Sequence, residues 1–370
     1  MSSIESEKKN RISLFVQKLG AWFLYLIFLI FVAEIAAGYA LDLYRKIRFD
    51  STDYSIMEHD LSKELEQVQG RATLSLYRWY QNAPNFKGIH VITDPSGFRI
   101  DQKALDNRIL IGMYGGSTAF SVLTDQENTI SNQISQQSDL FQVLNFGVGG
   151  YSTSAEIMTL VESLRSYPNL KIVFFYDGVN ELGRAIEAQF KNIKENESEF
   201  ILGTPYIEGV KAAIRNSTGP GFSLSDSNLY YIYERILARK TLADLQTNDL
   251  IQSVKERYFA NLKIFNAICR EYELKCIFII QPTIHTTHDS VLTDSEITIK
   301  KNDIWGKIYP RLVQEIFSDH RAKSFGVIDL STALDTKKNT QRVFNDWHHL
   351  NSQGNKIIAD RIKNYIDMNF

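Results

Sequence analysis

The chain carries almost no net charge and has no dense run of basic residues. Among its 370 residues, 41 lysines and arginines stand against 43 aspartates and glutamates, for a formal charge of -2. A nucleic-acid partner would require a basic surface to neutralise the phosphate backbone, so we expect none. The sequence also lacks internal repeats and low-complexity segments, and its length permits one sizeable core.

Cysteine is scarce, since Cys269 and Cys276 are the only two in the sequence. They do not indicate a disulfide framework. We favour two buried free thiols, and a single bridge stays open if the domain lies in an oxidising compartment.

Two patterns lack the residue that would complete a cofactor or metal site. GVGGYS (residues 147–152) superficially resembles a dinucleotide-binding loop, but it has no third glycine in register. TIHTTHD (283–289) places His285 and His288 three residues apart, without an obvious third ligand nearby. We therefore expect no cofactor and no metal ion, and we interpret the second pattern as a polar loop of the functional site.

The N-terminus holds a long apolar run, LGAWFLYLIFLIFVAEIAAGYALDLY (residues 19–44), interrupted by Glu34. Between Ala21 and Ala33 it has none of the polar residues that an amphipathic core helix requires. Residues 20–41 can span a bilayer, which needs roughly 20 residues. We predict a single-pass signal anchor, with residues 1–19 cytoplasmic and the rest of the chain periplasmic or extracellular, although the flanking charges bias this orientation weakly. A cleaved signal peptide is the alternative.

Beyond a stalk and lead-in at 42–104, short apolar runs alternate with segments of helical periodicity. The runs are nearly continuous, as in strands buried on both faces, and they lie at 108–114, 141–147, 171–178, 275–282 and 325–331. This alternation predicts an α/β fold with a parallel sheet of about five strands and covering helices. Residues 183–250 do not follow this alternation of strands and helices, so we predict an insertion there within a domain of 105–370.

Glycines and polar residues follow the predicted strands, at the edge where parallel sheets bind ligands. GGSTAFS (115–121) leaves Ser117 at a tight corner between a strand and a helix. NFGVGGYST (145–153) contributes Gly150, and DGVNE (177–181) contributes the side-chain amide of Asn180. Backbone amides near Ser117 and Gly150, with the Asn180 amide, could together stabilise an oxyanion.

DWHHLN (346–351) comes after the last predicted strand, where we expect it to start the final helix. Residues three apart are neighbours on a helix, so Asp346 can hold His349, while His348 points elsewhere. A serine, an imidazole and a carboxylate that orients the imidazole make a nucleophilic triad. We therefore predict Ser117, His349 and Asp346 as catalytic residues.

The four blocks GGST, NFGVGGYS, GVNE and DWHHL, in this order, resemble those of the SGNH hydrolases, also called the GDSL family. The resemblance covers roughly residues 105–370 and implies a flavodoxin-like, three-layer α/β/α fold. Two positions depart from the family: Gly116 precedes the serine and Glu181 follows Asn180, where aspartate is usual in both places. Neither position belongs to the triad. GFR (97–99) also resembles a lead-in of anchored members, without chemistry that the sequence defines.

The resemblance implies a small acyl ester, a lipid or an acetylated glycan as substrate. We predict a membrane-anchored serine ester hydrolase that acts through an acyl-enzyme on Ser117. An O-acyltransferase for an envelope polysaccharide, using the same triad, is one alternative, and a non-catalytic glycan-binding protein of the same fold is another. Taken singly, Ser117 and Asp346 could be ordinary helix N-caps. An inverted anchor would make the protein an esterase that faces the cytoplasm.

Overall fold

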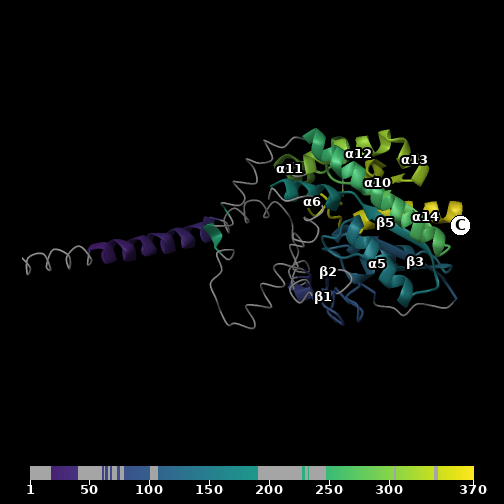
Figure 1. Cartoon of the computed structure of the whole chain (residues 1–370), viewed down its shortest axis with the longest axis horizontal. Coiled ribbons are helices and arrows are strands. Elements are labelled where there is room, and N and C mark those ends of the chain that lie inside the picture. Colours follow the sequence, from purple (N-terminus) through teal and green to yellow (C-terminus); the bar gives the residue numbers. More distant parts are fainter. Residues whose placement is uncertain are drawn as a thin grey trace, which may run out of the picture. The chain divides into compact units, whose positions relative to one another are not determined.

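The computed structural model describes residues 18–40, 79–100, 107–190, 247–303, 306–336 and 341–370, with a few more between 61 and 75 and between 227 and 232. Figure 1 shows these segments coloured along the chain. The chain divides into two units, one of Met1–Asp53 with Pro220–Asp244 and one of Tyr54–Gly219 with Leu245–Phe370. The second unit contains all of the candidate site residues.

A five-stranded parallel sheet forms the centre of the second unit, in the order β4-β3-β5-β6-β7. Its strands are β3 (Ile109–Gly115), β4 (Phe141–Asn145), β5 (Leu170–Asp177), β6 (Lys275–Ile280) and β7 (Ile328–Asp329). The predicted parallel sheet of five strands is confirmed, although the last strand is only two residues long. Crossovers in this order bring the carboxyl ends of β3, β4 and β5 side by side.

Helices cover both faces of the sheet. One group is α5 (Thr153–Ser166), α6 (Val179–Phe190), α10 (Thr247–Glu271), α12 (Tyr309–Ser318) and α13 (His320–Phe325). The second group is α4 (Ile130–Gln136) and α14 (Ser352–Asn369). Figure 1 shows α10, α12 and α13 near one another, in green to yellow-green. The three-layer α/β/α class is therefore confirmed.

Alternate strand residues face opposite helix layers, which explains the continuous apolar runs. Met113 and Phe174 belong to one buried cluster with Ile358 of α14. Phe175, the next residue on β5, packs its ring 3.8 Å from that of Phe265 on α10. Because both faces of each strand are buried, a strand of this sheet has no polar alternation.

The second unit also contains shorter elements. The helices are α3 (Ser117–Phe120), α11 (Asp294–Asn302) and the 3-10 turns η1 (Gln126–Asn128), η3 (Asp289–Val291), η4 (Gly306–Ile308) and η5 (Ala333–Thr336). Ahead of the sheet, β1 (Thr73–Ser75) and β2 (Trp79–Gln81) form an antiparallel pair. Most of the predicted insertion at 183–250 lies outside the described residues.

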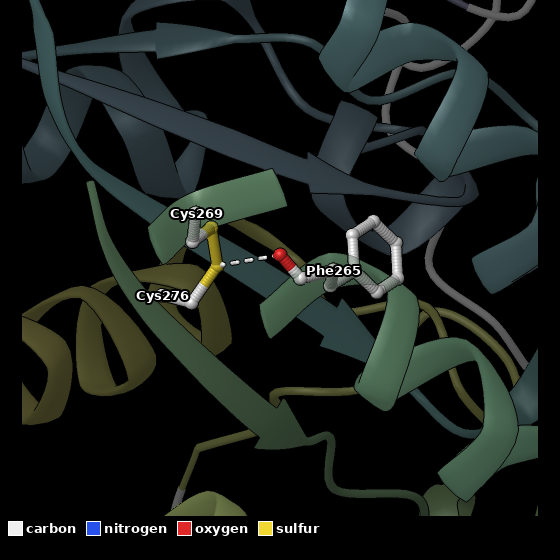
Figure 2. Close-up of a disulfide and its surroundings, with 3 residues drawn as sticks. All are labelled: Phe265, Cys269 and Cys276. Atoms are coloured by element: carbon white, nitrogen blue, oxygen red, sulfur yellow. Dashed lines mark hydrogen bonds between the residues drawn. A yellow bond between two sulfur atoms is a disulfide. The ribbon is translucent and has the colours of Figure 1, made fainter. Parts of the chain in front are cut away.

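Cys269 and Cys276 form a disulfide, so the prediction of two free thiols is wrong (Figure 2). Cys269 lies in the last turns of α10 and Cys276 on β6, and a tight reversal with a positive φ of 54° at Glu273 separates them. This reversal brings the two Cα atoms to 6.0 Å, a normal separation for a bridge. Cys276 Sγ also lies 3.8 Å from Phe265 O.

The helix Lys18–Ala40 is long and apolar enough to cross a membrane, and a signal sequence would meet the same criterion. Within the first unit, its one acidic residue has hydrogen-bond partners. Glu34 accepts bonds from the Ser227 hydroxyl at 2.7 Å and from the backbone N–H groups of Asn228 and Leu229. The carboxylate thus accepts hydrogen bonds from the first backbone N–H groups of a short helical segment that comes much later in the sequence.

Candidate active site

Two glycines make the corner between β3 and α3, where Ser117 is the first helical residue. Gly115 has a φ of +151°, and a Cβ there would lie 2.7 Å from Tyr176 O. A Cβ on Gly116 would collide with the side-chain amide of Asn180. Any side chain at position 116 would therefore require the Asn180 amide to move.

The structure brings Ser117, His349 and Asp346 into one hydrogen-bonded chain. Ser117 Oγ lies 2.7 Å from His349 Nε2, and His349 Nδ1 lies 2.6 Å from Asp346 Oδ2. The other oxygen of Asp346 accepts the backbone N–H groups of His348 at 2.9 Å and His349 at 2.7 Å. Serine, imidazole and carboxylate therefore stand in the order that proton transfer from a nucleophile requires.

Residues 345–348 form a bend and not the start of the last helix, which begins at Ser352 with Asn351 as its N-cap. Asp346 bonds to backbone N–H groups two and three residues ahead, and such local bonds compete with helix formation. The prediction that His348 points away from Asp346 is therefore wrong. Its Nδ1 lies 3.3 Å from Asp346 Oδ1, and its ring centroid lies 3.8 Å from that of His349.

Charge states at this cluster follow from burial and from the neighbouring rings. Burial acts to raise the pKa of Asp346, but His349, His348 and the hydrogen bonds outweigh it and hold that pKa well below its usual range. Burial, helped by the proximity of His349, lowers the pKa of His348 to about 3. At neutral pH Asp346 is therefore ionised and His348 is neutral.

Gly150 and Asn180 lie beside the nucleophile corner. Asn180 Nδ2 donates to Tyr151 O at 2.6 Å, and a Cβ on Gly116 would lie 3.1 Å from that same oxygen. Gly150, with a φ of +78°, is in the left-handed region that favours glycine. The loop after β4 and the corner after β5 thus meet at the residue that precedes Ser117.

Glu181 joins these two segments, and its role was missed at the sequence level. Its Oε1 accepts the backbone N–H of Thr153 at 2.8 Å, and its Oε2 accepts that of Gly178 at 2.9 Å. Burial raises the pKa of this carboxyl, while the two bonds oppose the shift. The only signal in the sequence was the unusual glutamate after Asn180.

Tyr80 and Arg99 also contact the site segments from the predicted lead-in. Tyr80 Oη donates to Gly149 O at 2.6 Å, and Arg99 donates to Ser121 O, just past α3, at 2.8 Å. Neither residue belongs to the four blocks. The GFR pattern was the one hint at Arg99, and nothing in the local pattern pointed to Tyr80.

His285 and His288 do not converge on a common point. His285 Nε2 lies 2.7 Å from Asp303 Oδ2, whereas His288 Nδ1 lies 2.7 Å from the Ser290 hydroxyl. Within the described ranges, the group of side chains close enough to share a metal ion is Asp346, His348 and His349. Asp346 and His349 already take part in the hydrogen bonds that lead to Ser117, and a metal ion bound by them would break these bonds.

No protein-family model and no curated protein matches the chain. Solved structures do match it. A GDSL-like lipase from Bacteroides thetaiotaomicron is 11% identical, over 73% of this chain and 93% of that one, with a TM-score of 0.34. A member of the lipolytic G-D-S-L family from Veillonella parvula is 10% identical, over 68% and 95%, with a TM-score of 0.36. An acetylxylan esterase from Geobacillus stearothermophilus, solved as a catalytic mutant, is 11% identical, over 70% and 94%, with a TM-score of 0.36.

Two of these neighbours carry the name of the GDSL family, which the four blocks resemble. Their identities of 10 to 11% and TM-scores of 0.34 to 0.36 are too low to carry a substrate or a residue role to this chain. The function therefore rests on the geometry of its own site.

Proposed function

We propose that the chain is a serine ester hydrolase that acts through an acyl-enzyme on Ser117. The observation that carries the proposal is the continuous contact from Ser117 Oγ through His349 to Asp346, at 2.7 and 2.6 Å. Such a series of hydrogen bonds activates a serine hydroxyl, which is a weak nucleophile by itself. A serine that only capped a helix would need no imidazole, and the Gly116–Phe120 turn has no side-chain cap.

In the proposed reaction, Ser117 Oγ attacks the acyl carbon while its proton moves to His349 Nε2. The ester oxygen then leaves as an alcohol with that proton, and the acyl group stays on Ser117. Water attacks the acyl-enzyme next and gives one proton to His349, which returns it to Ser117 Oγ as the acyl carbon–Oγ bond breaks and the acid leaves. Asp346 holds the imidazole in the tautomer that accepts at Nε2, and it stabilises the imidazolium.

Three donors are proposed for the oxyanion: the backbone N–H groups of Ser117 and Gly150 and the side chain of Asn180. The Asn180 amide carries two N–H donors, and within the described residues one of them goes to Tyr151 O. The other is available to a substrate oxygen beside Gly116. Loss of one such donor typically costs about 3 to 4 kcal/mol of transition-state stabilisation.

We further propose that the N-terminal helix anchors the protein and that the domain lies outside the cytoplasm. The apolar helix Lys18–Ala40 supports a single membrane span. The Cys269–Cys276 bridge supports an oxidising compartment, because glutathione keeps most cytoplasmic thiols reduced. A small acyl ester, a lipid or an acetylated glycan is the substrate class we propose.

To test this proposal, the full chain in detergent is treated with a fluorophosphonate probe, and the adduct is located by peptide mass spectrometry. We expect an adduct on Ser117 that is absent from Ser117→Ala and retained in Ser324→Ala, a matched change at an exposed serine on α13. A folded wild-type chain without an adduct on Ser117 would contradict the proposal and favour a binding protein. With an active serine, product analysis with and without a sugar acceptor separates hydrolysis from acyl transfer.

A further inference from the structure

A residue outside the four blocks forms a hydrogen bond with the peptide group between Gly149 and Gly150. Tyr80, on β2, is 3% exposed, and its hydroxyl donates to Gly149 O at 2.6 Å across 69 residues of sequence. Arg184 Nη2 donates to the next carbonyl oxygen, Gly150 O, at 2.7 Å. Two consecutive carbonyl oxygens of this loop are thus fixed by side chains.

Tyr80 is itself fixed. Its backbone carbonyl accepts the hydroxyl of Tyr151, the residue after Gly150. The two rings pack edge to face with centroids 5.1 Å apart. Tyr80 and the glycine loop therefore contact each other through two hydrogen bonds and an aromatic pair, and a shift of one would displace the other.

Peptide geometry connects this contact to the site. The carbonyl of Gly149 and the N–H of Gly150 belong to one planar trans unit and point in opposite directions. Fixing the carbonyl oxygen therefore fixes the direction of the Gly150 N–H. Two consecutive glycines would otherwise leave this peptide unusually free to rotate. A hydrogen bond to the carbonyl also polarises the N–H and strengthens it as a donor.

Burial raises the pKa of the Tyr80 hydroxyl to about 12, although the Arg184 guanidinium beside it acts in the opposite direction. The hydroxyl is therefore protonated throughout the neutral range. It can donate to Gly149 O at any pH at which the triad would work.

We propose that Tyr80 is a positioning residue of the oxyanion hole, which directs the Gly150 N–H toward the substrate oxygen by holding the carbonyl of the same peptide. The inference rests on the proposed function, because it assigns Gly150 a role in acyl transfer. It also makes β2 part of the catalytic apparatus.

The kinetic test compares Tyr80→Phe with wild type and with Tyr114→Phe, using the full chain in detergent and a 4-nitrophenyl ester. Tyr114 is the matched control because it is also buried and its hydroxyl lies 2.5 Å from that of Ser163, on α5. We expect Tyr80→Phe to lower kcat by about 10- to 100-fold, somewhat less than deleting a donor outright. KM and the midpoint of the pH profile should not change, and Tyr114→Phe should retain its kcat.

A second measurement does not depend on turnover. The sequence has two Gly–Gly pairs, Gly115–Gly116 and Gly149–Gly150. With glycine labelled at its carbonyl carbon and its nitrogen, only the amides of Gly116 and Gly150 give carbonyl-coupled NMR signals. Tyr80→Phe should move the Gly150 signal and leave that of Gly116 in place, whereas Tyr114→Phe should leave the Gly150 signal unchanged.

The outcomes separate the two proposals. An unchanged Gly150 signal and an unchanged kcat in Tyr80→Phe would overturn the positioning role and leave the serine hydrolase standing. A rise in KM with a drop in melting temperature, but no selective loss of kcat, would reduce Tyr80 to a packing residue and overturn it too. A wild-type chain without a reactive Ser117 would instead remove the proposed function itself.

Discussion

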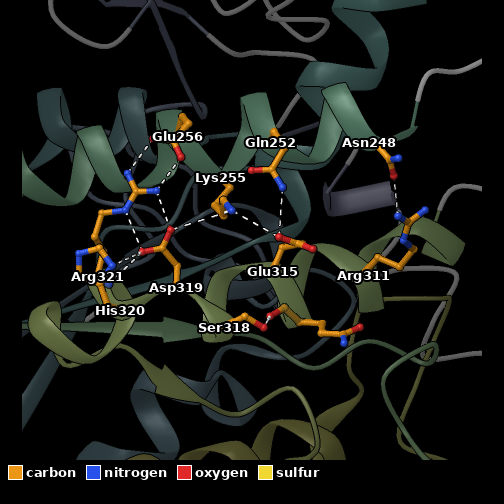
Figure 3. A network of polar contacts seen from close by, with 11 residues as sticks. Asn248, Gln252, Lys255, Glu256, Arg311, Glu315, Ser318, Asp319, His320 and Arg321 are labelled. Carbon is orange, nitrogen blue, oxygen red and sulfur yellow. Dashed lines mark hydrogen bonds and ion pairs between the residues drawn. The ribbon is translucent and has the colours of Figure 1, made fainter.

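The candidate active site and the outer surface of α10 are both held by short polar contacts, but they differ in burial. Figure 3 shows the outer network, in which α10 side chains meet those of α12 and α13. There Arg321 lies 2.6 Å from Glu256, whose side chain is 58% exposed. In the site, the buried Tyr80 and Glu181 bond to backbone groups at 2.6 to 2.9 Å.

Equal distances do not mean equal energies in these two regions. An exposed ion pair gains little, because water and salt screen it and two long side chains lose freedom. A buried hydrogen bond to the backbone leaves a costly unsatisfied group when its partner is removed. We therefore expect mutations at the site to have large effects and mutations in the outer network to have small ones.

The largest effect is expected from Asp346→Asn. The amide would donate to His349 Nδ1 and stabilise the tautomer in which Nε2 carries a proton and cannot accept one from Ser117. From comparable triads we expect kcat to drop by about 10⁴-fold. Ester turnover by the full chain measures this, with thermal melting as the control for folding. A drop smaller than about tenfold would mean that the carboxylate does not set the tautomer.

A smaller but still large effect is expected from Arg99→Met, measured as stability. Arg99 is 1% exposed and donates to five acceptors, which are the carbonyl oxygens of His90, Phe120, Ser121 and Thr124 and the side chain of Gln126. The segment it binds includes Ser121 and Leu123, both with positive φ, a strained conformation for these residues.

We expect Arg99→Met to lower the free energy of unfolding by about 3 to 5 kcal/mol, because several buried carbonyl oxygens lose their donor. Denaturant unfolding of wild type and variant measures the difference. Arg99→Lys is the informative companion, since an ammonium group cannot reproduce the planar fork and should recover only part of the loss. Full stability in Arg99→Lys would show that charge alone is sufficient.

The smallest effect is expected from Glu256→Gln in the outer network. The hydrogen bond from Arg321 lowers the pKa of Glu256, so the carboxylate stabilises the fold above its ordinary pKa. This contribution is lost as the pH falls through the lowered value. We expect a loss of roughly 1 kcal/mol or less at neutral pH, and less in high salt. A loss comparable to that of Arg99→Met would contradict the contrast between the two regions.

Local sequence patterns predicted the sheet because its strands are buried on both faces and read as continuous apolar runs. The candidate site could be predicted because Ser117, Gly150 and Asn180 each follow a strand whose end lies at the same edge. Tyr80 could not, since its partner lies 69 residues away on a different element. The sequence left the disulfide open as the alternative to two free thiols, because the bridge depends on how the end of α10 lies against β6, which periodicity does not describe.

The contact of Glu34 bears on how the protein is made. An acidic side chain within an apolar span is costly unless its charge is hydrogen-bonded. The partner hydroxyl of Glu34 belongs to Ser227, 193 residues later in the sequence. During synthesis the helix Lys18–Ala40 therefore emerges long before the residues that satisfy its carboxylate. The hydrogen bonds to the Glu34 carboxylate can form only after more than half of the chain has been translated.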